Sequence, residues 1–347
     1  MIRIGILGAA DIAVRRFLPP LINSTEYELA GIASGSTYEK GLPFADTSNI
    51  ADNRAEETQE QYQQRIAKVK AVTDQFGGSV YDSYESMLRD ESIDAVYIPL
   101  PPACHYYWGR KALLAGKHVY MEKPFTTNLK DTEDLISLAR DKGVAVFENY
   151  GFTYHKQVEL IDKLMQERLG DLRLLRAYFG FPKRKDSDFR YSDKLGGGSL
   201  LDAGGYAIKI ARHYLGDELR ILASSFSEMP GHDVDGWGSV MAVGRDNVVC
   251  QLSFGMDNQY KCDLELWGSV GTIHAPRIFT PPPQFVPKIS VTDMNGTEYF
   301  ESECDDAFAH SQELFAKGVT DINERTREYE EILIQSRIVN EVKNGQK

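Results

Sequence analysis

The sequence lacks any apolar run long enough to cross a lipid bilayer. A membrane-spanning helix needs about 20 consecutive apolar residues, and no stretch of the 347-residue chain has that character. Residues 1–5 read as the start of a strand and not as the basic and apolar regions of a signal peptide. We therefore expect a cytoplasmic protein with no membrane partner.

The sequence also has fewer basic than acidic residues. The chain has 39 Lys and Arg against 51 Asp and Glu, which gives a formal net charge of −12. Nucleic acids and anionic membranes attract clustered Lys and Arg, so we predict no nucleic acid as a main partner. A local basic pocket for one phosphorylated small molecule is compatible with this balance.

Cysteine is sparse and scattered. Its four copies are Cys104, Cys250, Cys262 and Cys304, and no two of them form a Cys-x-x-Cys pair. This spacing argues against a zinc knuckle or a thiol-redox motif, and we predict no metal. Without a secretory signal, the thiols are expected to stay reduced.

What the sequence does contain is a regular alternation of strand and helix signals. With 42% hydrophobic and 26% charged residues, the composition is that of a globular protein, and the length suffices for two domains. The strands predicted in the first part of the chain are residues 2–7, 28–33, 95–98, 117–121 and 144–147. Alternation with helices predicts an α/β domain over residues 1–149, a Rossmann-type doubly wound parallel sheet covered by helices on both faces.

From about residue 150 strands dominate. The segments 239–243 and 248–256 flank the turn Gly244–Asn247, which predicts a hairpin. We predict an α+β domain over residues 150–347, with an open antiparallel or mixed sheet, helices on one face, and a C-terminal helix able to pack back on the first domain. A one-sided sheet leaves apolar surface to cover, so we expect a homodimer or homotetramer formed through it.

A polar, acidic segment interrupts the first domain at residues 39–75. It reads as a surface insertion that continues into a helix at residues 62–76. A solvated face is the usual role of such a charge run, and a flap or an oligomer contact near the cofactor is the alternative.

The turn after the first strand carries a variant of the dinucleotide fingerprint. There the first glycine makes the tight turn, the second lets the pyrophosphate approach, and a small third residue packs helix against strand. Gly8, Ala10 and Ala13 fill these places, so alanine replaces the usual second glycine. The helix N-terminus would face phosphate, and a plain strand-to-helix turn is the alternative. The cofactor contacts predicted on this turn are Gly8, Ala10, Asp11 and Ile12.

The end of the second strand bears on the choice between NAD and NADP. An acidic residue there binds the ribose 2′-hydroxyl of NAD, whereas NADP needs a site without that charge. The segment that follows Ala33 holds Ser34 and Ser36 and reaches its first carboxylate at Glu39. This favours NADP(H), with both serines as phosphate donors. No arginine occurs at the tip, so NAD(H) stays possible.

A lysine follows another strand in the run Met121-Glu122-Lys123-Pro124. Proline fixes its own φ and restricts the residue before it, which limits the freedom of Lys123. An ammonium group at the C-terminal end of a parallel strand faces the crevice where such sheets bind ligands. A lysine that merely ends the strand is the alternative on this run alone.

A second constellation lies beyond the first domain. A glycine loop at residues 196–198 leads through Ser199 into a helix that carries Asp202 and Tyr206. These two residues are four apart and share one helix face. They predict either a site or a tyrosine that is hydrogen-bonded to an aspartate to brace the core.

Together these motifs resemble those of the Gfo/Idh/MocA family of NAD(P)-dependent oxidoreductases over essentially the whole chain. The matching segments are residues 5–13, 99–105, 115–119, 122–124, 148–150 and 196–206. Within the family the chain looks most like the sugar 3-ketoreductases that act on nucleotide-linked deoxysugars. The segments behind this closer likeness are residues 10–16, 96–101, 267–269, 279–282 and Tyr206, where other members often carry histidine.

The resemblance implies roles at the matching positions. Lys123 would sit beside the nicotinamide and the substrate carbonyl, with Asp202 and Tyr206 as catalytic residues of the same pocket. Glu122 and His105 would border the nicotinamide ribose. The further cofactor contacts implied are Pro99 and Leu100. The second domain would bind the substrate and form the oligomer.

Two further features belong to this comparison. Pro124 is expected to follow a cis peptide, as in the family. Pro102 replaces the asparagine often found before the helix of His105, and the insertion after residue 39 is longer than the family usually has.

The implied reaction is hydride transfer between NADP(H) and a sugar ring carbon, with 3-keto reduction of a nucleotide-linked sugar as the leading hypothesis. The alkoxide formed needs a proton, and Tyr206 is the preferred donor. A phenol with a pKa of about 10 needs assistance, which a nearby Lys123 cation would give. Lys123 could also polarise the carbonyl directly, so the proton donor stays open.

The sequence indicates the substrate contacts less specifically than the cofactor contacts. Arg184, Lys185 and Arg190 precede the glycine loop and could meet a substrate diphosphate, although most such cations are merely exposed. Tyr154 and His155 follow the last strand of the first domain and could reach the same pocket, with a structural histidine as the alternative.

Two alternatives of function stay open. One is a dehydrogenase of a free sugar, inositol or trans-diol; a separate variant would keep the cofactor bound permanently and use redox cycling to hydrolyse glycosidic bonds. The other is a non-catalytic NADP-responsive regulatory or scaffold protein, against which the presence of both Lys123 and Tyr206 argues.

Overall fold

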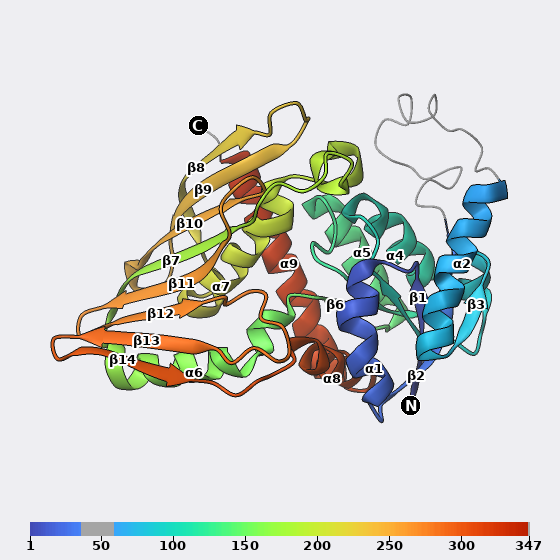
Figure 1. The fold of residues 1–347 in the computed structure, drawn as a ribbon, viewed down its shortest axis with the longest axis horizontal. Coiled ribbons are helices and arrows are strands. Elements are labelled where there is room, and N and C mark those ends of the chain that lie inside the picture. Colours follow the sequence, from blue (N-terminus) through green and yellow to red (C-terminus); the bar gives the residue numbers. More distant parts are fainter. Residues whose placement is uncertain (36–58, 346–347) are drawn as a thin grey trace. The chain divides into compact units, whose positions relative to one another are not determined.

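The computed structural model describes residues 1–35 and 59–345, which form two compact units (Figure 1). The first unit consists of Met1–Asn149 and Ser311–Leu333, and the second of Tyr150–His310 and the chain from Ile334 onward. The sequence prediction gave all of residues 150–347 to the second domain and allowed the C-terminal helix to return to the first. Ser311–Leu333 is the segment that clusters with the first unit.

The first unit is built on a parallel sheet. Its six described strands are β1 (Ile2–Leu7), β2 (Tyr27–Ala33), β3 (Ser79–Tyr81), β4 (Ala95–Ile98), β5 (His118–Met121) and β6 (Val146–Glu148). Their order is β3-β2-β1-β4-β5-β6, and every neighbouring pair is parallel. The strand order reverses at β1, and ligands of such sheets bind at the carboxyl ends of the strands near this reversal. The predicted Rossmann-type fold is confirmed.

Helices of the first unit cover both faces of this sheet. They include η1 (Ala13–Phe17), α1 (Leu18–Asn23), α2 (Gln59–Phe76), α3 (Tyr84–Arg89), α4 (His105–Leu114) and α5 (Leu129–Lys142). On one face Tyr97 of β4 stacks on Phe17 with ring centroids 3.7 Å apart. On the other face Val96 and Met121 join a core cluster that contains Trp108 of α4 and Leu135 of α5. Because both faces are buried, the strands are nearly continuous apolar runs, as parallel sheets require.

The second unit is built on a mixed sheet. Its eight described strands are β7 (Leu172–Gly180), β8 (Arg220–Glu228), β9 (Asp235–Val243), β10 (Val249–Gly255), β11 (Lys261–Gly268), β12 (Thr272–Pro276), β13 (Lys288–Asp293) and β14 (Gly296–Glu301). The order is β14-β13-β12-β11-β7-β10-β9-β8. The β7–β10 pair is parallel and the other neighbours are antiparallel, which makes the sheet mixed.

Helices lie against one face of this second sheet, as Figure 1 shows for α6 (Lys156–Leu164) and α7 (Gly205–Leu215). Val240 and Ala242 of β9 point to that face and share a core cluster with Ile208 of α7. The alternate residues Trp237 and Met241 are exposed. The period of two along β9 therefore separates a helix-covered face from an open one, and the predicted α+β architecture is confirmed.

Some local elements differ from the sequence predictions. The C-terminal helical region, predicted as one helix, is divided into α8 (Ala307–Thr320) and α9 (Ile322–Asn344). Asp321 separates them, because its carboxylate accepts the Asn323 N–H at 2.8 Å and so caps α9. No glycine or proline marks this break, and the sequence pattern therefore reads through it. The short elements β3 and α3 were not predicted.

The helix predicted at residues 62–76 is present as α2. Residues 36–58, which include most of the acidic insertion and Ser36, lie outside the described part of the chain. Among the described helices, none is long and apolar enough to cross a bilayer.

Candidate active site

The turn between β1 and η1 has the geometry that the fingerprint predicts. Gly8 has a φ of +93°, and a Cβ there would lie 2.9 Å from the hydroxyl oxygen of Tyr84. A side chain would be strained at that φ, so glycine suits this turn. The Ala10 carbonyl accepts the N–H of Ala13 at 3.0 Å and thereby starts the helical turn. Ala13 is 1% exposed, which is why the third position must be small.

The first turn of this helix also holds the other two predicted contacts, Asp11 and Ile12. Asp11 Oδ2 forms an exposed ion pair with Arg15 Nε at 2.6 Å, one helical turn on. An exposed pair of this kind adds little to stability.

The end of β2 holds a second cluster. Ser34 is 1% exposed, and its N–H donates to the Tyr81 carbonyl at 2.7 Å. Its hydroxyl accepts a hydrogen bond from Nη1 of Arg65 on α2. The sequence prediction looked for an arginine at the strand tip, and it missed one that lies 31 residues further on.

Glu122 follows β5 and sits in a polar network. Its Oε1 accepts hydrogen bonds from the Tyr97 hydroxyl and from Nδ2 of Asn149, both at 2.7 Å. The amide oxygen of Asn149 in turn accepts from the Tyr120 hydroxyl at 3.0 Å. Burial raises the pKa of Glu122, while these hydrogen bonds and the neighbouring Lys123 act in the opposite direction. Tyr97 and Asn149 were not predicted as members of the site.

The loop that carries Lys123 is fixed from several directions. The Lys123–Pro124 peptide is cis, as the resemblance implied. His105 is fully buried, with Nδ1 2.8 Å from the Pro124 carbonyl oxygen and Nε2 2.8 Å from that of Leu100. The Phe125 N–H donates to Oε1 of Glu148 at 2.7 Å. These contacts hold the backbone on the C-terminal side of Lys123.

His105 therefore anchors the lysine loop. Burial lowers its pKa, although the two carbonyl contacts favour the charged ring. Pro102 lies in the short helix Pro102–Cys104 that leads directly into α4 and so positions the ring. Pro99 and Leu100 follow β4 on the segment that His105 holds. The predicted contacts of these residues with the cofactor stay predictions.

In the second unit, Asp202 is engaged by a cation. Asp202 lies in the π-helical turn Leu200–Gly204, and its Oδ2 accepts Nε of Arg190 at 2.7 Å. Arg190 Nη1 also contacts Asp188 Oδ1 at 3.1 Å. Burial opposes the charge on Arg190, but the two carboxylates outweigh it and raise its pKa. The structure thus pairs a predicted substrate contact with a predicted catalytic residue.

Tyr206 lies one turn beyond Asp202 in a cluster of aromatic rings. Its ring centroid is 5.2 Å from that of Tyr150, 5.1 Å from Phe179 and 5.5 Å from Phe152. Phe279 lies at 5.7 Å. These rings fix the plane of the phenol by packing.

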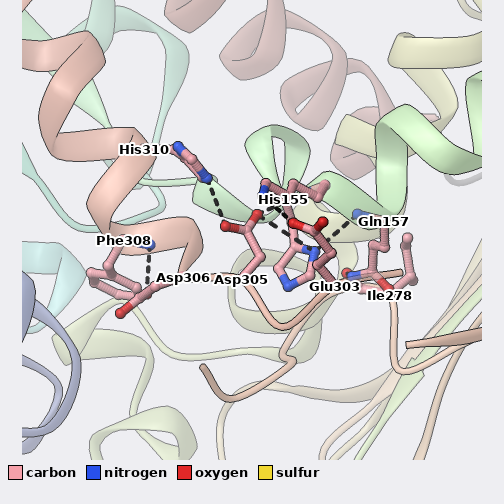
Figure 2. Close-up of polar contacts among 9 residues, drawn as sticks. His155, Gln157, Ile278, Glu303, Asp305, Asp306, Phe308 and His310 are labelled. Carbon is pink, nitrogen blue, oxygen red and sulfur yellow. Dashed lines mark hydrogen bonds and ion pairs between the residues drawn. The ribbon is translucent and has the colours of Figure 1, made fainter. Parts of the chain in front are cut away.

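The polar cluster in Figure 2 shows His155 at the start of α6. Its Nδ1 accepts the Gln157 N–H at 3.1 Å and thereby caps the helix. Asp305 Oδ2 lies 4.0 Å from the same nitrogen, and Asp305 Oδ1 contacts His310 Nε2 at 2.7 Å. Burial acts against ionisation of Asp305, but its hydrogen bonds and the two histidines lower its pKa. A structural role of His155, which the sequence left open, accounts for these contacts.

Tyr154 and Arg184, two more of the substrate candidates, occupy different places. Tyr154 ends the short helix Gly151–Tyr154 and is partly exposed. The Arg184 N–H donates to the Tyr191 hydroxyl at 2.7 Å, and its guanidinium carbon lies 5.3 Å from the Phe181 ring centroid. Their contact with a substrate stays a prediction.

Several of the predicted residues thus form a group in each unit. The first unit gathers the lysine loop, Glu122 and His105 beyond the carboxyl ends of β4 and β5. The second gathers Arg190, Asp202 and Tyr206 around the start of α7. Convergence of the two groups on one carbonyl stays a prediction. Within the described residues, no cluster of three or more His, Cys, Asp or Glu side chains could hold a metal ion.

Comparisons with known proteins cover both units. The model of an oxidoreductase family with an NAD-binding Rossmann fold matches residues 2–150. The model of the GFO/IDH/MocA C-terminal domain matches residues 158–274.

Similar proteins cover nearly the whole chain. A dTDP-3,4-didehydro-2,6-dideoxy-alpha-D-glucose 3-reductase from Actinomadura kijaniata is 34% identical over 99% of this chain and 95% of its own length. A protein of the same name from Saccharopolyspora spinosa is 34% identical over 92% of this chain and 87% of its own. The crystal structure of a 3-ketoreductase from Actinomadura kijaniata with NADP and TDP-benzene matches with a TM-score of 0.87 at 33% identity. That match covers 100% of this chain and 98% of the other.

Proposed function

This chain belongs to the Gfo/Idh/MocA family of oxidoreductases, and we propose that it reduces the 3-keto group of a nucleotide-linked deoxysugar with NADPH. The similarity to dTDP-sugar 3-reductases over almost the whole length supports this substrate class. The observation that carries the chemistry is the lysine loop, in which His105 and Glu148 fix the backbone around Pro124 and Phe125. A fixed cation stabilises a developing alkoxide without reorganising first.

The site fits NADP(H) by the chemistry of its donors. Gly8 keeps the β1 turn open at a φ that glycine tolerates, and the following helix begins with small residues. Ser34 and Arg65 present a hydroxyl and a guanidinium at the end of β2, where the adenosine ribose of a dinucleotide lies in this fold. When bound, the reduced nicotinamide supplies the hydride that the ketone carbon receives.

Lys123 and Tyr206 are the groups that we assign to the carbonyl oxygen. Hydride addition leaves negative charge on that oxygen, and the ammonium of Lys123 offsets it. We assign proton delivery to the Tyr206 hydroxyl, whose ring is held by Tyr150 and Phe179. The proton moves from the phenol oxygen to the alkoxide and is restored from solvent.

Asp202 acts in this proposal as a positioning residue. A carboxylate held at 2.7 Å by a guanidinium is a weak general base. Arg190 bridges Asp202 and Asp188, so the Arg190–Asp202 pair presents hydrogen-bonding groups one turn from Tyr206. We propose that this pair orients the sugar ring, with Arg184 and Tyr154 as further contacts of the nucleotide-linked substrate.

The test of this function is a comparison of substrate classes. The purified protein should oxidise NADPH when given the dTDP-linked 3,4-diketo sugar, and NMR should show a new hydroxyl at carbon 3 of the product. Oxidation of free sugars, inositol or trans-diols with NADP+ is the control. Turnover of the free polyols but not of the nucleotide-linked ketone would refute the substrate class.

The proposal includes a homodimer or homotetramer formed through the open face of the second sheet. Trp237, Met241 and Trp267 on that face are 37%, 40% and 52% exposed. Large apolar side chains exposed on one sheet face are a common feature of interaction surfaces. Light scattering should give a multiple of the 39.0 kDa chain mass, and Trp267→Glu should lower it. A monomer at every concentration would contradict the proposal.

A cytoplasmic location also belongs to the proposal. The cysteines of the described residues are free thiols, with Cys104, Cys250 and Cys262 buried and Cys304 exposed. Free thiols are the usual state in a reducing compartment. Fractionation of the native cells would test it.

A further inference from the structure

We propose that Arg65, delivered by α2 to the end of β2, is the cation that recognises the 2′-phosphate of NADP(H) and selects it over NAD(H). This inference deepens the proposed function and rests on its cofactor. It assigns discrimination to a residue far in sequence from the strand tip where such a residue is normally sought.

The position of Arg65 follows from how α2 packs. Val69 and Val72, four and seven residues further on, are 2% and 7% exposed. Residues at this spacing lie on one face of a helix, so Arg65 continues the buried face of α2 toward its N-terminal end. Its Cζ also lies 5.3 Å from the ring centroid of Tyr62, on the preceding turn. The guanidinium is thus carried on a packed helix.

Ser34 supplies the second group of the site. Its backbone is fixed by the hydrogen bond to the Tyr81 carbonyl, and its side chain is buried. The hydroxyl accepts from Nη1 of Arg65 and retains its own O–H as a donor. A hydroxyl and a guanidinium side by side form a donor pair that matches phosphate oxygens.

The adjacent residue explains why the cation comes from α2. Gly35 directly follows Ser34, and a Cβ there would lie 2.5 Å from atoms of the Tyr84 ring. The Tyr84 hydroxyl also donates to the Gly35 carbonyl at 3.2 Å. No side chain fits at this position without moving Tyr84, so an arginine cannot occupy it. The helix instead reaches across to Ser34.

The absence of a carboxylate directly after β2 also favours NADP(H) over NAD(H). From Ala33 to Tyr38 the sequence contains no carboxylate that could accept from the 2′-hydroxyl of NAD. A guanidinium binds a phosphate with two parallel hydrogen bonds but gains much less from a hydroxyl. In a chain with a net charge of −12, this is a local basic site for one phosphate group.

The test compares Arg65→Gln with Lys68→Gln, which removes the same charge from an exposed position of α2. Cofactor binding is measured by fluorescence titration of NADPH and NADH without substrate. We expect Arg65→Gln to weaken NADPH binding about ten- to a hundredfold and to change NADH binding less than about threefold. Lys68→Gln should leave the NADPH to NADH ratio unchanged.

A readout independent of turnover is the competition of adenosine 2′,5′-bisphosphate with NADPH, compared with that of adenosine 5′-monophosphate. The wild-type preference for the bisphosphate should disappear in Arg65→Gln and persist in reduced form in Arg65→Lys. If Arg65→Gln weakens NADPH and NADH binding equally, Arg65 only braces α2 and the inference is overturned. Any other result that leaves the ratio of NADPH to NADH affinity unchanged also overturns it. If Arg65→Gln does not fold, an Arg65→Lys preference equal to that of the wild type overturns it.

The proposed reductase function and the proposed role of Arg65 can be refuted independently. A protein that discriminates the 2′-phosphate through Arg65 but does not turn over the nucleotide-linked sugar keeps this inference and loses the substrate assignment. A protein that reduces the sugar equally well with either cofactor loses this inference alone.

Discussion

Replacing Glu148 with alanine removes the acceptor that holds the backbone of Phe125, two residues beyond Lys123. The Phe125 N–H donates to Oε1 of Glu148 at 2.7 Å, and the two residues are 2% and 7% exposed. A hydrogen bond to a charged group contributes about 1.5–3 kcal/mol, and a buried donor left without an acceptor costs a similar amount. We therefore expect Glu148→Ala to lower the free energy of unfolding by about 2–3 kcal/mol.

The first measurement is hydrogen exchange at the Phe125 amide together with thermal unfolding. For a domain of 150–250 residues, this loss corresponds to a melting temperature lower by about 4–12 °C. The Phe125 amide should exchange faster than its neighbours on β5. Glu148→Gln keeps an oxygen acceptor without the charge, so we expect about half of the effect. Glu133→Ala, an exposed acid on α5, is the matched control.

The second measurement is turnover. Loosening the loop displaces the ammonium of Lys123, and a shift of about 1 Å in a catalytic group can cost about a hundredfold. We expect kcat to fall about ten- to a hundredfold in Glu148→Ala, with NADPH affinity nearly unchanged. Wild-type exchange at Phe125 with wild-type kcat would show that Glu148 does not anchor the loop.

Three other predictions address the cofactor turn, the reaction and the pH dependence of stability. Lys123→Met and Tyr206→Phe should each lower kcat at least about tenfold while NADPH titrations stay near wild type; wild-type rates in both would refute the assignment. Gly8→Ala should cost about 1–3 kcal/mol because of the φ of +93°, measured by denaturant unfolding. The new Cβ would lie 2.9 Å from the Tyr84 hydroxyl oxygen, so adding Tyr84→Phe should remove only the steric part of this loss of stability. Full recovery of the free energy of unfolding in the double variant would contradict the backbone-strain argument. Burial and a nearby arginine lower the pKa of His118 to about 4, so stability should fall from about pH 6.5 toward pH 4, by at most about 1.4 kcal/mol per pH unit. His118→Gln should flatten this slope in acid unfolding curves.

The Arg190–Asp202 pair changes how the second group of residues is interpreted. The family resemblance implied a catalytic role for Asp202, and the place of Arg190 before the glycine loop made it a candidate contact of the substrate diphosphate. The 2.7 Å contact between them and the 3.1 Å contact of Arg190 with Asp188 make the three side chains one ion-pair cluster. Removal of Arg190 would leave the partly buried carboxylates of Asp188 and Asp202 without this cation, so loss of activity in a single variant would not identify a proton donor.

The sequence predicted the elements whose patterns are local. Strands β1, β4 and β5 are nearly continuous apolar runs, and the glycine turn at Gly8 has a fixed local geometry. Periodicity missed β3 and α3, which have three and six residues. Segments this short do not complete enough turns or alternations for a period to stand out.

The position of the lysine loop was predictable because one short motif carries it. Glu122, Lys123 and Pro124 are consecutive, and the strand before them sets their place at the carboxyl edge of the sheet. The groups that fix this motif were not predictable, because the Tyr97 hydroxyl and the Glu148 carboxylate come from neighbouring strands. Lateral strand order places them beside the loop, and no local pattern encodes it.

By itself, the sequence determined the two-domain class, the cofactor turn and the lysine at the end of β5, since each depends on periodicity or on the backbone limits of glycine and proline. It also left the end of β2 without a carboxylate, which favoured NADP. Only the tertiary structure decided which cation lies at that end. Arg65 is 31 residues from Ser34, and only the packing of α2 through Val69 and Val72 places its guanidinium beside that hydroxyl.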